Sequence, residues 1–214
     1  MKVTVVYDND VYKAGLKEGW GFSAYIKNEH TPSILFDAGA DGPTLLHNMN
    51  VLGIAPETLR IIVISHAHGD HTGGLSDILR LNKTAELFLP NSFKGTFPGR
   101  RITIVQEDTV QICENVFSTG EIEAIEQALV LRTKKGIFVL PGCSHPAMKS
   151  ILGAASKIGE LYGIAGGFHG FHDFEAFKGL SLIYPCHCTM HKKEIRSFYK
   201  SKVMACGAGL EIEL

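Results

Sequence analysis

The sequence predicts an α+β fold in which two sheets pack together and helices lie outside them. Short runs rich in β-branched and aromatic residues recur along the 214-residue chain, and turn residues bound most of them, as is typical of strands. Helical patterns fall between these runs, and many strands with a few interspersed helices favour packed layers of sheet and helix. No internal repeat or low-complexity linker interrupts the chain, so we expect a single domain over residues 1–214.

The predicted elements follow from apolar runs and their flanking residues. The predicted strands are residues 3–7, 22–27, 33–36, 60–64, 86–89, 102–105, 110–113, 127–132, 136–140, 161–165, 182–184 and 210–214. The predicted helices are residues 41–52, 72–81, 146–158, 173–178 and 191–200. Pro43 near the start and Gly53 after the end of the first helix match common start and stop chemistry, and Thr72 is the predicted N-cap of the second. Residues 133–136 are predicted to form a hairpin turn.

The composition is that of an ordinary globular protein. Apolar residues make up 45% and charged residues 20%, and the formal net charge is −1, so no global field would attract nucleic acid or an anionic membrane. No segment has the signature of a secretory signal or a membrane span. We therefore expect a cytoplasmic protein with a small-molecule substrate, no nucleic-acid partner and no membrane partner. The five cysteines, an odd number, are expected to be free thiols.

Three histidines and one aspartate follow the buried strand predicted at 60–64. They lie in the sequence His66-Ala67-His68-Gly69-Asp70-His71. His66 and His68 are two residues apart, so an extended segment points both to one side, while Asp70 and His71 follow as the chain turns and face a neighbouring point. Room for this tight path is expected from three glycines, Gly69, Gly73 and Gly74. Imidazole and carboxylate are ligands that zinc accepts at ~2.0–2.2 Å, so the cluster predicts a metal site.

Further histidines recur in a common setting, an apolar strand followed by glycine or proline and then histidine. They are His145, His169 and His187. The remaining histidines are predicted to be ordinary core or surface residues; they are His30, His47, His172 and His191. Cys143 and Cys186 are predicted to be small buried hydrophobic residues rather than ligands. Asp37, after the strand at 33–36, either orients a ligand histidine or caps the helix that begins near Asp41.

The histidine cluster resembles a known family signature. Residues 66–71 match the His-x-His-x-Asp-His motif of the metallo-β-lactamase superfamily, and the motif follows a hydrophobic strand. Residues 34–39, 142–145 and 166–169 resemble one branch, metal-dependent hydrolases related to an archaeal dihydropterin–ribofuranosylaminobenzene phosphate synthase. Residues 187–189 resemble the final histidine motif of that branch.

The resemblance implies a four-layer αββα sandwich with two divalent metal ions at one edge. It implies that His66, His68 and His145 hold one ion, and that Asp70, His71 and His187 hold the other. The ions would be zinc, with manganese or iron as alternatives. His169 would lie where many members place a bridging aspartate, because no strand-end aspartate follows His145 here. Met190 also stands where the branch often has glycine.

The predicted activity is metal-dependent hydrolysis of a phosphodiester or a related phosphorylated small molecule. A metal lowers the pKa of bound water from 15.7 toward ~7 and so provides a hydroxide nucleophile. Asp70 would both ligate and orient this nucleophile, and His169 would donate to the developing oxyanion. One alternative is a transferase that joins a pterin-methyl pyrophosphate to an aryl amine, and another is a non-catalytic metal-binding sensor.

Two further features have two interpretations each. Basic residues could contact phosphate or could simply be solvated; they are Lys13, Lys17, Arg100, Arg101, Lys192 and Lys193. The segment 93–101 is predicted to be a loop that borders the site. Its residues Phe93 and Phe97 either stack on a flat ring of the substrate or close the core.

Overall fold

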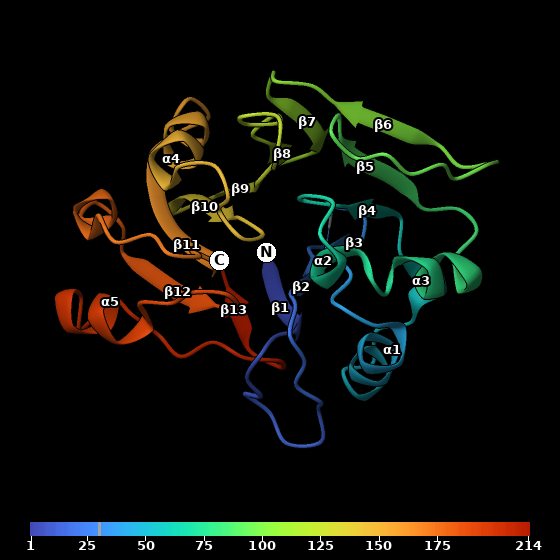
Figure 1. Cartoon of the computed structure of the whole chain (residues 1–214), viewed down its shortest axis with the longest axis horizontal. Helices are drawn as coiled ribbons and strands as arrows, with labels where there is room; N and C mark the ends of the chain where they lie inside the picture. The colour runs from blue at the N-terminus through green and yellow to red at the C-terminus, as the bar shows by residue number, and fades with distance from the viewer. Residues whose placement is uncertain (30) are drawn as a thin grey trace.

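Two sheets form the centre of the molecule (Figure 1). The computed structural model describes residues 1–29 and 31–214, and His30 lies outside the described residues. The first sheet has seven strands, in the order β13 (Glu211–Glu213), β1 (Lys2–Tyr7), β2 (Ser23–Lys27), β3 (Ile34–Phe36), β4 (Ile61–Val63), β5 (Glu86–Pro90) and β6 (Ile102–Val105). The second has six, in the order β12 (Leu182–Cys186), β11 (Leu161–Gly167), β10 (Gly136–Leu140), β9 (Leu129–Thr133), β8 (Val116–Ser118) and β7 (Val110–Cys113).

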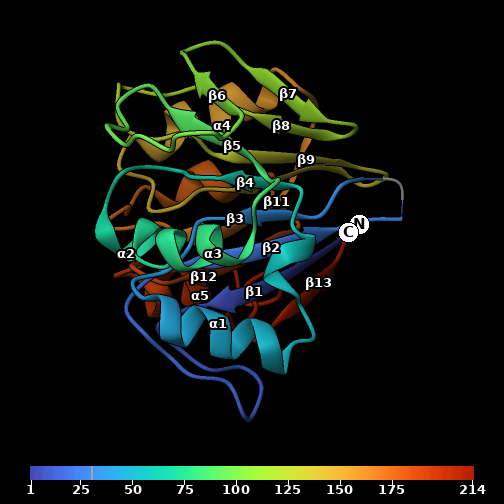
Figure 2. The same ribbon diagram turned by 90° about the vertical axis from the view of Figure 1, so that its right-hand side faces the viewer.

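Helices cover the outer face of each sheet. The first sheet carries α1 (Gly42–Val51), α2 (Gly69–Thr72) and α3 (Leu75–Leu81), which lie side by side in front of its strands in Figure 2. The second sheet carries α4 (Met148–Ser156) and α5 (Lys192–Phe198). Two short 3₁₀ turns complete the elements, η1 (Pro56–Thr58) and η2 (Phe174–Phe177). No helix among the described residues is both long and apolar enough to span a bilayer.

Three separate apolar cores lie between these layers. Alternate residues of a strand point to opposite faces of its sheet. Ile34 and Phe36 of β3 therefore pack between the sheets, in the same core as Phe138 of β10. Leu35, between them in sequence, packs in a second core with Leu45 of α1. A third core joins the second sheet to α4 and α5. The order helix, sheet, sheet, helix confirms the predicted αββα sandwich.

Parallel strands bring distant segments to one edge of the sandwich. Strands β3 to β6 are mutually parallel in the first sheet, and β10 to β12 are parallel in the second. The carboxyl ends of parallel neighbours lie at the same edge of a sheet. Every predicted site residue follows such an end: β3, β4, β10, β11 or β12.

Several predicted boundaries were wrong. The helix expected at 72–81 is two elements, because the turn that carries Asp70 is itself helical and Gly73 and Gly74 separate it from α3. Thr72 is therefore the last residue of α2 rather than an N-cap, and its Oγ1 donates to the His68 carbonyl at 3.0 Å. Residues 173–178 contain a 3₁₀ turn, and the three-residue strand β8 was not predicted.

The prediction of five free thiols was also wrong. Cys186, at the end of β12, is joined to Cys206 by a disulfide. The two meet because the chain after α5 runs back beside β12, where Val203 bridges to Ile183. Cys113, Cys143 and Cys188 are free. The cysteines therefore do not support a particular redox compartment.

Candidate metal centre

The histidine cluster lies where β4 ends and the chain turns into α2. His66 and His71 are buried, whereas His68 is exposed. His68 precedes α2 in an extended conformation, with φ −67° and ψ 149°. The single turn of α2 then carries Asp70 and His71 to a different side, which is the division into two groups that the sequence predicted.

Two of the three predicted glycines are needed for this path. A Cβ at Gly73 would overlap the carbonyl of Ala40, and a Cβ at Gly74 would overlap that of Ala38. A Cβ at Gly69 would meet nothing within 4 Å, so the expectation for Gly69 was wrong.

The first donor group consists of His66, His68 and His145. One nitrogen from each lies within 4.8 Å of the others. The ring centroids of His66 and His145 are 4.8 Å apart, and those of His68 and His145 are 4.6 Å apart. Nε2 of His145 is buried and has no hydrogen-bond partner. Burial, followed by the neighbouring imidazoles, lowers the pKa of His145 to about 4 and that of His66 further, so both are neutral at pH 7 and available to a metal.

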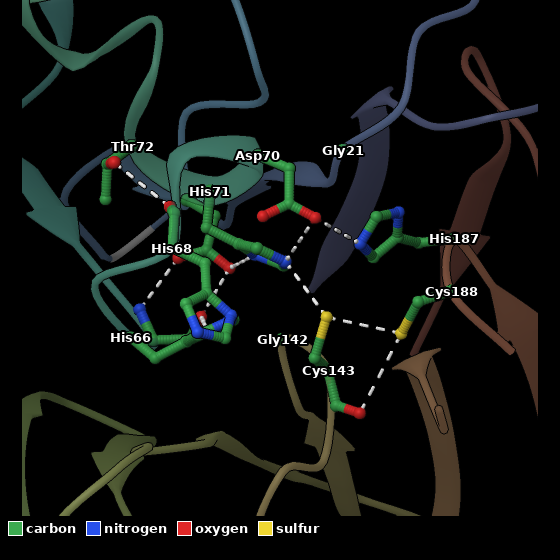
Figure 3. Close-up of polar contacts among 12 residues, drawn as sticks. Gly21, His66, His68, Asp70, His71, Thr72, Gly142, Cys143, His187 and Cys188 are labelled. Carbon is green, nitrogen blue, oxygen red and sulfur yellow. Dashed lines mark hydrogen bonds and ion pairs between the residues drawn. The ribbon is translucent and has the colours of Figure 1, made fainter. Parts of the chain in front are cut away.

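The second donor group consists of Asp70, His71, His187 and Cys143. Their donor atoms also lie within 4.8 Å of one another, and dashed lines in Figure 3 connect all four, from Cys143 to His71, from His71 to Asp70 and from Asp70 to His187. Asp70 Oδ2 is 3.3 Å from His187 Nε2 and 3.9 Å from His71 Nε2. His187, and then the other neighbouring imidazole, hold the pKa of Asp70 well below its usual range, so Asp70 is a carboxylate. The ring centroids of His66 and His71, one from each group, are only 4.2 Å apart.

Asp37 orients histidines in both groups. Its Oδ2 accepts hydrogen bonds from His71 Nδ1 and from Ser65 Oγ, each at 2.7 Å. Because the Ser65 hydroxyl donates to Asp37, it accepts from Nδ1 of His66 at 2.9 Å. Nδ1 of each ring therefore donates a hydrogen bond, and Nε2 is the atom directed at the cluster, where it lies 3.1 Å from His68 Nδ1 in His66 and 3.1 Å from Cys143 Sγ in His71. Of the two predicted roles for Asp37, the orienting role is the one observed; Asp41 caps α1.

Comparison with known proteins agrees with this geometry. A family model described as the metallo-beta-lactamase superfamily matches residues 20–87, which include the whole 66–71 motif. The solved structure of Tm1679, described as a metal-dependent hydrolase of the β-lactamase superfamily, is 28% identical, with a TM-score of 0.80 over 100% of this chain and 99% of that chain. This chain resembles members of the metallo-β-lactamase superfamily in fold and in the 66–71 motif.

Two more proteins are similar to this chain. One is an enzyme of Methanocaldococcus jannaschii, the 7,8-dihydropterin-6-methyl-4-(beta-D-ribofuranosyl)-aminobenzene-5'-phosphate synthase. It is 28% identical in an alignment of length 226 that covers 75% of this chain and 76% of that protein. YhfI from Bacillus subtilis is 13% identical with a TM-score of 0.74, over 100% of this chain and 99% of that chain, and this likeness shows the fold alone. The predicted resemblance is thus confirmed for the superfamily and for the archaeal synthase.

A buried carboxylate that the sequence analysis missed holds the turn after β10. Oε1 of Glu126 accepts hydrogen bonds from the backbone N–H groups of Gly142, Cys143 and Ser144 at 2.8–3.1 Å. Its Oε2 accepts from the N–H of His145 at 3.0 Å. Burial raises the pKa of Glu126, while these N–H donors oppose the rise because they stabilise the carboxylate. No local pattern around residue 126 signals this role, since its partners lie 16–19 residues away.

The segment after β1 holds His187 from the other side. Asn9 Oδ1 accepts from His187 Nδ1 at 2.9 Å, and Asn9 Nδ2 donates to the His187 carbonyl at 3.2 Å. Asp8 Oδ2 accepts from the backbone N–H of His187 at 3.0 Å. Nε2 of His187 is thereby left facing the second group, buried and without a hydrogen-bond partner. Asp8 and Asn9 were missed because their partner lies 178–179 residues away in sequence.

Backbone strain is concentrated at this edge. Seven non-glycine residues in the described part of the chain have positive φ, and four of them belong to the site loops: Asp37, Ser144, His169 and His187. Such conformations are uncommon for non-glycine residues and typically cost about 1–3 kcal/mol each, so the surrounding contacts must maintain them.

His169 lies beside the first group rather than within it. Its ring centroid is 5.0 Å from that of His145, and it is not among the donors that converge on either group. Its carbonyl accepts from the N–H of Met190, whose side chain is 70% exposed. His47 and His172 bond to backbone carbonyls and His191 lies near Glu194, so these histidines are ordinary, as predicted.

Some of the basic residues considered for phosphate binding already have other partners. Arg100 donates to the carbonyls of Leu79 and Asn82, Arg101 lies 3.4 Å from Glu86, and Lys192 pairs with Asp10 at 2.9 Å. These three therefore do not form a free phosphate site.

We predict that Glu126→Gln weakens metal binding. The amide retains one acceptor oxygen and turns an NH₂ group toward backbone donors, so the turn carrying His145 loses hydrogen bonds to a charged group. We expect roughly 2–4 kcal/mol lower stability and about 10–100-fold weaker zinc binding, measured by denaturation and by competition with a chromophoric chelator. Glu123→Gln, the same change at an exposed position, is the control. Unchanged zinc affinity in Glu126→Gln would refute this role.

A second prediction concerns Asp8, which is fully buried. Burial raises its pKa from 3.8 to about 6. Between these values a rising pH removes the proton from the unfolded chain but not from the folded one, so stability falls as pH rises, by up to about 3 kcal/mol. Urea denaturation of the parent relative to Asp8→Asn, from pH 4 to 7, should show this loss. Asp10→Asn should retain it; parallel profiles for the parent and Asp8→Asn would contradict the prediction.

Proposed function

We propose that the protein is a binuclear metal-dependent hydrolase that acts on a phosphodiester or a related phosphorylated small molecule. The observation that carries the proposal is the adjacency of two donor groups, joined where the rings of His66 and His71 lie 4.2 Å apart. The residues that we propose as ligands are His66, His68 and His145 of the first group and Asp70, His71 and His187 of the second. The description of Tm1679 as a metal-dependent hydrolase supports the same class of reaction.

The donor set fits two divalent ions. Nε2 atoms of His145 and His187 are buried without hydrogen-bond partners, a costly state unless another group contacts them. Neutral imidazoles and one carboxylate suit zinc first, and manganese or iron as alternatives. When bound, such a pair supplies Lewis acidity toward a phosphoryl oxygen and lowers the pKa of water.

We assign to Asp70 the role of orienting the attacking water. Its carboxylate stays ionised and its side chain is partly accessible, with 22% exposed. An ionised carboxylate at this point can accept a hydrogen bond from the attacking water and so hold one of its lone pairs toward the substrate.

We assign His169 to the stabilisation of the negative charge that develops on an oxygen of the substrate. Its ring lies next to His145, at the border of the first donor group. An imidazole N–H there can donate to the oxygen on which negative charge develops, a contribution that typically amounts to ~2.7–4 kcal/mol.

A cavity of about 370 Å³ beside the motif offers space for the substrate. It is lined by Ala67 of the motif, by Thr72 directly after the motif, and by the 92–97 loop. Phe93 and Phe97 line it, with ring centroids 6.0 Å apart, and they also pack against the core under the first sheet. Both roles considered for these phenylalanines are thus compatible with their position.

We predict that His68→Ala and Asp70→Ala lose metal and activity together. Each change removes one ligand from a different group, so bound metal per chain should fall and turnover of a diaryl phosphodiester should drop by more than about 100-fold. Metal content is measured by elemental analysis, and turnover is measured before and after chelation and zinc addition.

His172→Ala is the matched control, because His172 is an exposed histidine outside both groups. Full turnover after chelation would refute the proposal. Metal binding with no turnover of phosphodiesters, lactones or thioesters would favour a metal-binding sensor instead.

A transferase is the second candidate, supported by the 28% identity to an archaeal synthase. In that reaction an aryl amine would displace pyrophosphate from a pterin-methyl pyrophosphate. Product analysis with and without an aryl amine acceptor separates the two candidates, since a hydrolase gives the same product in both cases.

A further inference from the structure

We propose that Cys143 is the fourth protein ligand of the second donor group, so that this half of the site binds a thiophilic ion through sulfur. The inference rests on the proposed metal-dependent function and specifies the chemistry of one of its two ion sites. Cys143 was predicted from the sequence to be a small buried hydrophobic residue, and it is indeed buried, with 3% exposed. Its neighbours, however, are donor atoms rather than apolar side chains.

The distances around Cys143 match one coordination sphere. Cys143 Sγ lies 3.1 Å from His71 Nε2, the atom left free by the bond between His71 Nδ1 and Asp37. Asp70 Oδ2 is 3.9 Å from the same nitrogen, and 3.3 Å from His187 Nε2. Ligand atoms of a tetrahedral zinc site are separated by about 3.3–3.6 Å, given bond lengths of ~2.0–2.3 Å. These separations bracket that range, so a single ion could contact all four residues with small adjustments.

A second observation points to a ligand at the same place. Nε2 of His187 is buried and forms no hydrogen bond, although it lies 3.3 Å from Asp70 Oδ2, a member of the same group. Asn9 fixes the ring from its other nitrogen, so the ring cannot turn to find a partner without losing that bond. An ion among the four residues would satisfy this nitrogen.

Cys143 also occupies a place where a donor is otherwise absent. Without it the second group has only Asp70, His71 and His187, because no strand-end aspartate follows His145. The Cys143 backbone N–H donates to Glu126 Oε1 at 3.0 Å, and the His145 backbone N–H donates to Oε2 of the same carboxylate. One rigid turn therefore aims Cys143 at the second group and His145 at the first.

Cys188 supports Cys143 rather than replacing it. Its Sγ lies 3.2 Å from Cys143 Sγ, in a position to donate its S–H, and 3.8 Å from the Cys143 carbonyl (Figure 3). A hydrogen bond of this kind stabilises negative charge on the accepting sulfur. Coordination would exchange the Cys143 S–H bond for a sulfur–metal bond and release one proton to solvent. Because thiolate is a soft ligand, this group should prefer zinc or cobalt to magnesium or manganese.

The test is cobalt substitution of the full-length chain. Cobalt(II) is added to the metal-free protein in steps, and the absorption spectrum is recorded. We expect an intense sulfur-to-cobalt charge-transfer band in the near ultraviolet when the second donor group binds its ion, whichever of the two groups fills first. The band should disappear in Cys143→Ala and Cys143→Ser, and the ion of the second donor group should bind at least about tenfold more weakly.

Three cysteine variants serve as controls. Cys188→Ala should retain a band but at a shifted wavelength, because Cys188 contacts Cys143 Sγ without being a donor itself. Cys113→Ala should retain the band unchanged, because its sulfur lies outside the donor group. Cys206→Ala should also retain it. This control is needed because Cys186 and Cys206 lie with Asp8 within 4.8 Å of one another and would offer sulfur if their disulfide opened.

The outcomes distinguish this inference from the proposed function. A band that persists in Cys143→Ala, or a parent protein that binds two ions without the band, overturns the role of Cys143. If two ions bind and phosphodiesters are turned over without a sulfur band, only the cysteine ligand is refuted. A band that depends on Cys143, with no turnover of any phosphodiester, supports the ligand and refutes the hydrolase.

Discussion

The site depends most on the hydrogen bonds that backbone N–H groups donate to the buried carboxylate of Glu126. Four consecutive backbone N–H groups converge on its two oxygens, and no water competes with them, since the residue is almost fully buried. Hydrogen bonds to a buried ion are stronger than those between neutral groups. They hold the turn after β10 in a shape that includes a residue with positive φ, Ser144. His145 and Cys143 are thereby fixed before any ligand arrives.

Much of the fold could be predicted because its cause is local. The strand at 33–36 was predicted from its apolar run, and the structure uses its alternation fully, with Leu35 facing helices and its neighbours facing the other sheet. The helix boundaries at 72–75 were not predictable in this way. They depend on how closely Gly73 and Gly74 approach the carbonyls of another segment, which is a tertiary constraint.

The same distinction applies to the candidate site. Residues 66–71 form one continuous motif, and the strand-end setting of His145 and His187 repeats along the chain, so the sequence pointed to them. Glu126, Asp8 and Asn9 act on partners far away in sequence, and nothing in their own surroundings marks them. The Cys186–Cys206 disulfide was missed for the same reason, since it depends on the chain returning beside β12 after α5.

The two donor groups also have a mechanical consequence. Each one combines residues of both halves of the sandwich: His66 and His68 follow a strand of the first sheet, whereas His145 and His187 follow strands of the second. A bound ion would therefore cross-link the halves at one edge, and its binding energy would add to the cohesion of the whole domain. Resistance to heat and proteolysis would then depend on how much metal is available to the protein. The metal-free form would be the one that cellular quality control degrades most readily.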